Sequence, residues 1–320
     1  MSKRPFYYGI AFVLAVWTSS SAFGYETELG IGLFAGFNDN VANAVDSARQ
    51  GSAFGRSTLD LTMDWGSKTS NGAMFLNLGV DNDSYPDSGI EGNVSYEVNP
   101  GFRFHLLDRA LASALSYRFS NGTSYALSTA LLGGASGRKG GVGTLSSAGS
   151  DFTTEGFLGN ELSWKSEYSW SEYRAGASIK AGTRSYNESG RKDSLLSLEA
   201  SGGGAAFSSD FSFGFGLEKL SSDLSGYSYS GPYLYGLGLF PVSDAVSFSL
   251  LLRSGARSYA DSAGSQPRDD RLLTIEGAVD LELSSSLSLE MGIGRTSNNS
   301  SVESNSFASV ETSAGLLITF

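Results

Sequence analysis

The clearest indication of the fold is the segment Val310-Glu311-Thr312-Ser313-Ala314-Gly315-Leu316-Leu317-Ile318-Thr319-Phe320. Its even-numbered residues are mostly apolar, and its odd-numbered residues are mostly small or polar, with Leu317 as the exception. Because successive side chains of a strand point to opposite faces, this alternation predicts a β-strand with one apolar face. On its own, the segment fits either the edge strand of a soluble sheet or a strand that spans a membrane.

The same alternation recurs along the chain, and this repetition favours the membrane interpretation. Segments in which every second residue is apolar lie at positions 29–37, 59–65, 74–80, 94–106, 111–131, 158–164, 173–179, 196–200, 211–217, 229–239, 246–252, 273–283 and 287–293. A tilted strand crosses a bilayer with about 9–11 residues, of which every second one faces lipid. In the segment 229–239, we expect the lipid-facing side to be the one that carries Tyr229, Tyr233, Tyr235, Leu237 and Leu239.

Two short motifs bear on where strands end. Asn121-Gly122 is a hairpin signal, but the apolar residues keep to odd positions from Leu111 to Leu131. We therefore expect one long strand to continue through Asn121-Gly122. The alternation also continues through Asn99-Pro100-Gly101, which predicts one strand with a local defect at Pro100.

The connections between the segments alternate in length. Short ones lie near residues 66–71, 108–109, 165–169, 208–209, 241–244 and 284–286, and longer ones near 38–52, 81–89, 133–151, 186–192, 221–227, 259–271 and 297–305. Short turns on one side and longer loops on the other are typical of transmembrane β-barrels. We count about fourteen strands, with twelve or sixteen also open, because a barrel with both ends on one side has an even number.

The strand pattern and the ending on Leu316, Ile318 and Phe320 resemble those of Gram-negative outer-membrane β-barrels. The resemblance implies an all-β fold, in which residues 25–320 form one transmembrane antiparallel up-and-down barrel. It implies a place in the outer membrane, in contact with its lipid and lipopolysaccharide. It further implies assembly by the barrel-assembly machinery and periplasmic chaperones, with Leu316, Ile318 and Phe320 as the assembly signal. Asn38-Asp39-Asn40-Val41 resembles a short motif common to several such families and selects none of them.

Residues 1–24 have the pattern of a signal peptide. Lys3 and Arg4 supply the charged start, residues 6–17 form a short apolar core, and small residues follow. This order is that of a cleaved secretory signal, and cleavage after Ala22 or after Gly24 both fit. The apolar run is shorter than the roughly 18 residues that a membrane-spanning helix needs. The sequence therefore predicts export.

The composition argues against several classes of function. The formal net charge is −11 and the sequence pI is about 4.6, which argues against nucleic-acid binding, because that requires basic patches. The chain has no Cys and a single His, His105, so thiolate chemistry and clustered His ligands are excluded. We predict no enzyme, no cofactor and no metal site, and interpret His105 as a lumenal or interfacial polar residue. A mean hydropathy of −0.10 fits strands that are half polar.

If the apolar faces meet lipid, the opposite faces line a lumen. The charged residues expected to line this pore are Arg103, Arg118, Arg174, Lys180, Arg253, Glu276, Asp280, Glu282, Glu290 and Glu311. The acidic ones come from the last three strands and should form one wall, and carboxylate rings favour cations. The alternative is a solvated wall in which charges of both signs pair with one another and with water.

Aromatic residues near strand ends predict two girdles, because amphipathic rings favour the headgroup level of a membrane. The expected interfacial aromatics are Trp65, Trp164, Trp170, Tyr186 and Tyr259. Together these features favour an outer-membrane, porin-like channel for passive diffusion of small hydrophilic solutes, with a mild preference for cations. The alternative is a barrel without a channel, acting as a surface binding, structural or export and assembly component. A monomer and a trimer both stay open.

Overall fold

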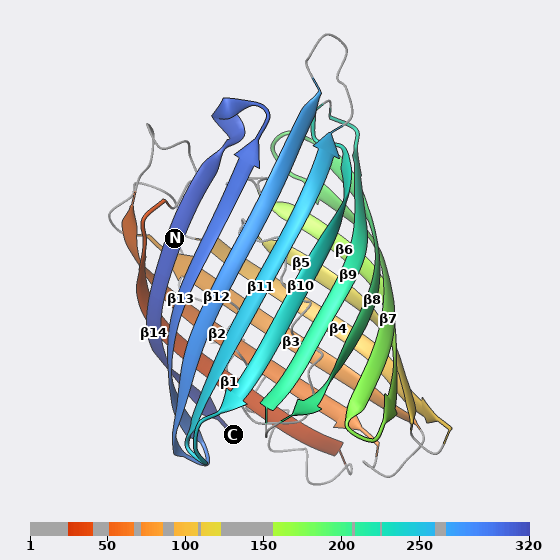
Figure 1. Ribbon diagram of the computed structural model, residues 1–320, viewed down its shortest axis with the longest axis vertical. Coiled ribbons are helices and arrows are strands. Elements are labelled where there is room, and N and C mark those ends of the chain that lie inside the picture. Colours follow the sequence, from red (N-terminus) through yellow and green to blue (C-terminus); the bar gives the residue numbers. More distant parts are fainter. Residues whose placement is uncertain are drawn as a thin grey trace.

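The computed structural model describes residues 25–40, 51–66, 72–85, 93–107, 110–122, 156–206, 209–224, 226–259 and 267–320. Figure 1 shows tilted strands that wrap into a closed barrel. They are β1 (Tyr25–Asn38), β2 (Ser52–Trp65), β3 (Gly72–Ser84), β4 (Asn93–Leu106), β5 (Leu111–Gly122), β6 (Phe157–Trp170), β7 (Tyr173–Tyr186), β8 (Lys192–Ala206), β9 (Ser209–Ser222), β10 (Tyr229–Pro241), β11 (Val246–Tyr259), β12 (Arg268–Ser284), β13 (Leu287–Ser300) and β14 (Phe307–Thr319), with a short 3-10 helix η3 (Glu303–Asn305) before β14. The predicted signal peptide at residues 1–24 and the loop at 133–151 lie outside the described residues.

Closure of the barrel joins the first and last strands. Each strand pairs with its neighbours in sequence, all ladders are antiparallel, and β1 pairs with β14. A closed sheet leaves no strand edge, which is the condition for a sheet to sit in lipid. The predicted transmembrane up-and-down barrel is confirmed with 14 strands. This closed barrel is the architecture that the resemblance to outer-membrane β-barrels implies.

Pro100 interrupts one ladder locally, as predicted. The β4–β5 ladder pairs Val98 with Phe119 and resumes at Gly101 with Ser116, while β4 itself continues through both residues between them. Proline has no backbone N–H to donate, so it is tolerated only at such a gap. The other expected long strand ends at Gly122 in the described residues, and its predicted continuation to Leu131 lies outside them.

The outward face of the barrel is apolar. Its exposed large side chains include Leu33, Met74, Phe102, Leu115, Leu162, Ile179, Phe213, Leu234, Leu250, Ile293 and Leu316. An exposed apolar surface of this kind is unfavourable in water and favourable in lipid. Charged side chains are destabilising on the lipid-facing side of a barrel and are tolerated on the side that faces the lumen. No helix in the described part of the chain is long and apolar enough to cross a membrane.

The orientation of β10 differs from the prediction. Tyr233 and Tyr235 face inward, because they share a face with the paired residues Gly216 and Gly214 and bond to Glu199. Leu234, on the opposite face, is the outward residue and is 58% exposed. The inward face thus takes the tyrosines, whose hydroxyls find polar partners there, and the lipid side takes leucine, glycine and proline.

The two ends of the barrel differ in their connections. At the short-turn end, brief connections link β2–β3, β4–β5, β6–β7, β8–β9, β10–β11 and β12–β13. The other end, here called the long-loop end, carries the remaining connections. The C-terminus lies at the same end as the β12–β13 hairpin, at the bottom of Figure 1. The predicted two-sided pattern of turns and loops is therefore present. The short connection expected near residues 165–169 is wrong, because β6 continues through them to Trp170 and the turn lies at residues 171–172.

Candidate functional site: the inward face of the barrel

All the charged residues expected to line a pore lie on the inward faces of their strands. Antiparallel partners project to the same side of a sheet, and each of these residues shares its side with inward ion pairs. Arg118 contacts Glu97 and Glu161, for example, and Arg56 contacts Glu311. The structure does not gather the ten residues into one site, but divides them among three regions.

The first region is a belt of alternating charge, here called the charge belt. It consists of Glu97 on β4, Arg118 on β5, Glu161 on β6, Lys180 on β7 and Glu199 on β8. The Nε of Arg118 lies 3.1 Å from a carboxylate oxygen of Glu97, and its Nη1 lies 3.8 Å from Glu161. Lys180 is within electrostatic range of Glu161 and Glu199. Because opposite charges follow one another from strand to strand, this sector is close to neutral.

Tyrosines extend the belt toward β11. The hydroxyls of Tyr233 and Tyr235 donate to the two carboxylate oxygens of Glu199, at 2.9 and 3.0 Å. The guanidinium of Arg253 lies 4.8 Å from the centre of the Tyr233 ring. Gly216 makes room for that ring, because a Cβ there would lie 2.2 Å from it. Sequence reasoning missed this cluster, since it took the tyrosine face as lipid-facing.

The second region is the acidic wall on β12–β14, formed by Glu276, Asp280, Glu282, Glu290 and Glu311. Asp280 and Glu290 are direct partners across β12 and β13. Glu276 and Glu311 flank the same residue, Gly294, from either side. Arg56 forms an ion pair with Glu311 at 3.5 Å. This pair involves one of the five carboxylates, so it neutralises the wall only in part, and the net charge of the wall stays negative.

The third region lies at the short-turn end. Arg103 lies 3.7 Å from Asp64, and Arg174 bonds Asp210 with both terminal nitrogens. These two arginines are therefore separated from the mid-barrel cations Arg118, Lys180 and Arg253. A pair such as Arg174–Asp210 holds its geometry by two parallel hydrogen bonds.

Arginines stack on aromatic rings near the long-loop end, a feature that the sequence analysis did not anticipate. The pairs are Arg56 over Phe54, Arg184 over Phe157, Arg191 over Tyr186 and Tyr227, Arg257 over Tyr229, and Arg268 over Tyr259. Stacking of this kind contributes about 0.5–2 kcal/mol per pair. A sequence signal exists for one of these pairs, because Phe54 and Arg56 are two residues apart on one face of β2.

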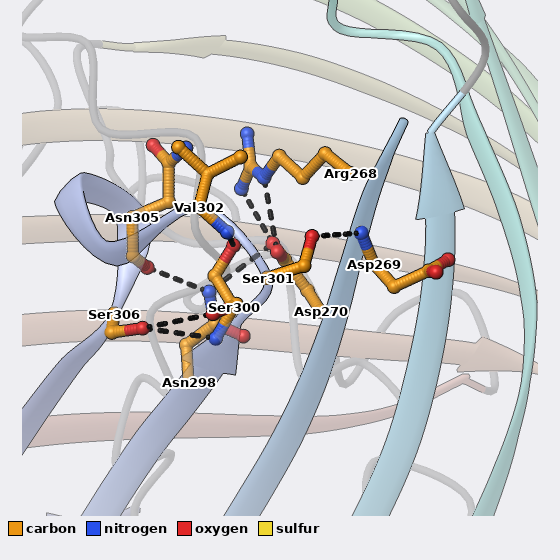
Figure 2. Close-up of polar contacts among 9 residues, drawn as sticks. All are labelled: Arg268, Asp269, Asp270, Asn298, Ser300, Ser301, Val302, Asn305 and Ser306. Atoms are coloured by element: carbon orange, nitrogen blue, oxygen red, sulfur yellow. Dashed lines mark hydrogen bonds and ion pairs between the residues drawn. The ribbon is translucent and has the colours of Figure 1, made fainter. Parts of the chain in front are cut away.

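A polar network fixes the long-loop end of β12–β14 (Figure 2). Arg268 donates to Asp270, and the side-chain amide of Asn298 donates to Asp270 at 3.1 Å and to the carbonyl of Asn305 at 2.8 Å. Ser306 accepts from the backbone N–H of Ser300 at 3.0 Å. The network ties η3 to β12 and β13.

Asp270 is ionised by this network. Burial alone would raise its pKa, but hydrogen bonds from Arg268, Ser300 and Asn298 and the charge of Arg268 together lower that pKa below its ordinary value. Its chain neighbours Asp269 and Arg271 are exposed on the outward face. The apolar outward residues of the strands, here called the apolar band, begin on β12 only at Leu273, so Asp270 lies outside this band.

The expected interfacial aromatics divide between the two faces. Trp65 and Trp170 face outward at the short-turn end, with exposed fractions of 37% and 45%. Trp164 also faces outward, but its partners Leu115 and Ile179 place it inside the apolar band. The prediction is wrong for two tyrosines, Tyr186 and Tyr259, which are buried on the inward face beneath Arg191 and Arg268.

The terminal strand keeps its predicted pattern. Leu316, Ile318 and Phe320 share the outward face, and Leu316 and Phe320 are 43% and 55% exposed. The backbone of Phe320 exchanges two hydrogen bonds with Leu29 of β1, at 2.9 and 3.2 Å. The last residue therefore takes part in closing the barrel.

Basic side chains also point outward near the long-loop end. They are Lys192 on β8, Lys219 on β9, Arg271 on β12 and Arg295 on β13, all exposed. Lys219 follows the apolar outward residues Phe213, Phe215 and Leu217 along β9. These cations thus border the apolar band on the side of the long loops.

Comparisons with known proteins bear on the fold alone. No protein-family model and no curated protein matches the chain. Among solved structures, OmpT of Vibrio cholerae folded in vitro has a TM-score of 0.49 at 11% identity, covering 93% of this chain and 100% of that one. An anion-selective porin from Comamonas acidovorans has a TM-score of 0.45 at 10% identity, covering 92% and 100%. A Pseudomonas aeruginosa FadL homologue has a TM-score of 0.48 at 9% identity, covering 93% and 90%. All three TM-scores lie below 0.5, so the architecture rests on the chain's own strands and their pairing.

Proposed function

We propose that this protein is an outer-membrane channel for small hydrophilic solutes, with a mild preference for cations. The observation that supports it is the distribution of charge: the outward face is apolar, while the inward face carries the charge belt and the acidic wall. Barrels of this size enclose more space than their own side chains fill, since about eight strands suffice for a filled interior.

The preference for cations follows from the imbalance between the two sectors. In the charge belt, cations and carboxylates alternate and largely cancel. In the acidic wall, Asp280 and Glu290 are neighbours, and Glu276 and Glu311 lie on either side of Gly294. Carboxylates that line a pore raise the local concentration of cations, and salt screens the effect.

Planar-bilayer recording of the refolded chain tests this function. We expect discrete conductance steps and a reversal potential that favours cations under a salt gradient. Replacing Asp280→Asn together with Glu282→Gln removes two inward charges and should move the reversal potential toward zero. The matched control is Asp269→Asn, which removes an outward charge on the same strand and should leave it unchanged. A folded barrel that gives no steps contradicts the channel.

The partners that we propose follow from the surface. Lys192, Lys219, Arg271 and Arg295 suit the phosphates of lipopolysaccharide in the outer leaflet, because each basic residue near an anionic membrane surface contributes about 1 kcal/mol. Leu316, Ile318 and Phe320 suit recognition by the barrel-assembly machinery. This placement would put the long loops outside the cell and the short turns in the periplasm.

A second candidate function is a barrel without a channel that binds or assembles at the surface. It is favoured by the packed long-loop end, where Arg–aromatic stacks and the Asp270 network line the inward face. Bilayer recording separates the two candidates, because a silent but folded barrel supports the second.

A further inference from the structure

We propose that Asn38, Asp39 and Asn40 form a lock that closes the barrel by clamping β1 to β14. These three residues are here called the seam lock, and the β1–β14 ladder is the seam. The inference concerns how the barrel closes, and does not depend on whether the lumen conducts.

The seam is the weak ladder of this barrel. It runs from Gly30 paired with Thr319 to Asn38 paired with Glu311, nine partner pairs in all, whereas β1 and β2 share fourteen. Glycines at 30, 32, 36 and 315 contribute no side chain to it, and glycine weakens a strand interior. Its two strands also lie at opposite ends of the sequence, so no hairpin turn holds them together.

The seam lock adds side-chain bonds where the seam ladder ends. The carboxylate of Asp39 accepts from the backbone N–H of Val310 at 2.7 Å, and the backbone N–H of Asp39 donates to the Val310 carbonyl at 3.0 Å. The amide of Asn40 donates to the carbonyl of Ala308 at 2.9 Å, and Asn40 is fully buried. Each residue thus holds the β14 backbone beyond the last ladder pair.

Asn38 orients the lock from within. Its side-chain oxygen accepts from the backbone N–H of Asn40 at 2.8 Å and from the hydroxyl of Ser309 at 2.8 Å. Its side-chain nitrogen donates to Glu311 at 3.2 Å. The Asn38 side chain therefore stabilises the turn that follows β1, as asparagine side chains commonly do by bonding to the backbone two residues on. The same side chain also bonds to β14.

An ion-pair chain supports the lock across three strands. Arg56 on β2 contacts Asp83 on β3 at 2.7 Å and Glu311 on β14 at 3.5 Å. It bridges β1, whose inward residues at this level are Phe34, the partner of Arg56 in the ladder, and Gly36. A Cβ at Gly36 would lie 2.5 Å from the Phe54 ring that covers it, so glycine keeps β1 flat beneath the bridge.

The test compares two buried clusters at the same end of the barrel. The lock variant is Asp39→Ala with Asn40→Ala, and the control is Asn298→Ala. The control removes one hydrogen bond from β13 to Asp270 of β12, its hairpin partner, and one to Asn305 of η3 in the β13–β14 connection. Each is made with and without Gly30→Cys and Thr319→Cys, a partner pair in the seam. Gly30 has room for the new side chain, because the nearest atoms to its Cβ position, both of Asp60, lie 3.9 Å away. The chain has no other Cys.

The readout is the temperature at which the folded band is lost in unheated gel electrophoresis after refolding into lipid. We expect the lock variant to lower this temperature, and the oxidised cysteine pair to restore most of the loss. In the control, the same disulfide should restore little of the loss. If the lock variant does not refold by itself, refolding of its oxidised cysteine form supports the lock. Equal rescue of both variants, or no rescue of the lock variant, overturns it.

Discussion

Among single residues, one ionised carboxylate, that of Asp270, stabilises the long-loop end of the barrel. Asp270 is almost fully buried, yet Arg268 and Asn298 donate to it, and its pKa is lowered. In the unfolded chain the same group titrates at its ordinary value near 3.8. The folded state therefore binds fewer protons at acid pH, and stability must fall as the pH falls.

Substituting Asp270→Asn should remove part of the acid sensitivity of the fold. Asp270 contributes fully to the free energy of unfolding at pH values above its pKa in the unfolded chain. This contribution is lost as the pH falls through the lower pKa that Asp270 has in the folded barrel. Urea unfolding in lipid at neutral and acid pH measures it. We expect the variant to be less stable at neutral pH by about 1–3 kcal/mol and to lose less on acidification. An unchanged pH dependence contradicts the assignment.

The residues that sequence alone placed correctly are those with strict alternation. Asp280 and Glu282 sit between large apolar residues on β12, so parity puts them inward. The prediction for Tyr186 and Tyr259 is wrong because it rests on their position near strand ends, whereas the alternation along β7 and β11 puts both on the inward face. Arg184 and Arg257, two residues earlier, share their faces and would have indicated the inward side.

At the scale of elements, β10 shows where alternation is ambiguous. One of its faces holds tyrosines and leucines, and the other holds glycine, proline and leucine, so both look apolar. The inward choice depends on Glu199 of β8 and Gly214 and Gly216 of β9. These partners belong to other strands, and their proximity is known only once the barrel is closed.

Single spin labels test the orientation of β10. A nitroxide at Leu234→Cys should collide with oxygen dissolved in lipid and be shielded from a water-soluble paramagnetic reagent. A label at Tyr235→Cys should show a smaller oxygen effect, because it faces the lumen. The chain has no other Cys, so each label reports one site. The reverse pattern would restore the outward tyrosine face predicted from the sequence.

The register of the ladders was predictable only in part. Continuous alternation through Pro100 correctly gave one strand, because proline removes one donor without shifting the phase. The seam was not predictable from local pattern, since Asn38-Asp39-Asn40 has the composition of an ordinary turn. Its bonds to Ala308, Ser309 and Val310 join residues at opposite ends of the chain.

At the scale of the whole molecule, Phe320 has two separable contributions. Its backbone exchanges hydrogen bonds with Leu29, and its ring is exposed on the outward face. Replacing Phe320→Ala keeps the backbone bonds and removes the ring, whereas deletion of Phe320 removes both. The two variants therefore separate closure of the barrel from recognition of its end.

We expect Phe320→Ala to refold in vitro like the natural chain but to reach the outer membrane poorly in cells. Deletion of Phe320 should impair both, because two backbone hydrogen bonds contribute about 1–3 kcal/mol in total. Refolding yield in lipid and the amount of folded barrel in outer-membrane fractions measure the two effects. Normal assembly of Phe320→Ala in cells rules out a role of the ring in recognition.

Because β1 and β14 are neighbours, the order of strands around the barrel has no natural starting point. Tyr25 and Phe320 both lie at the short-turn end, so a short linker can join them after removal of residues 1–24, and new termini can be opened in another connection. Such a circular permutant converts the seam into an ordinary hairpin. Asn38, Asp39 and Asn40 then become dispensable, and the permuted chain needs a comparable clamp at its new junction.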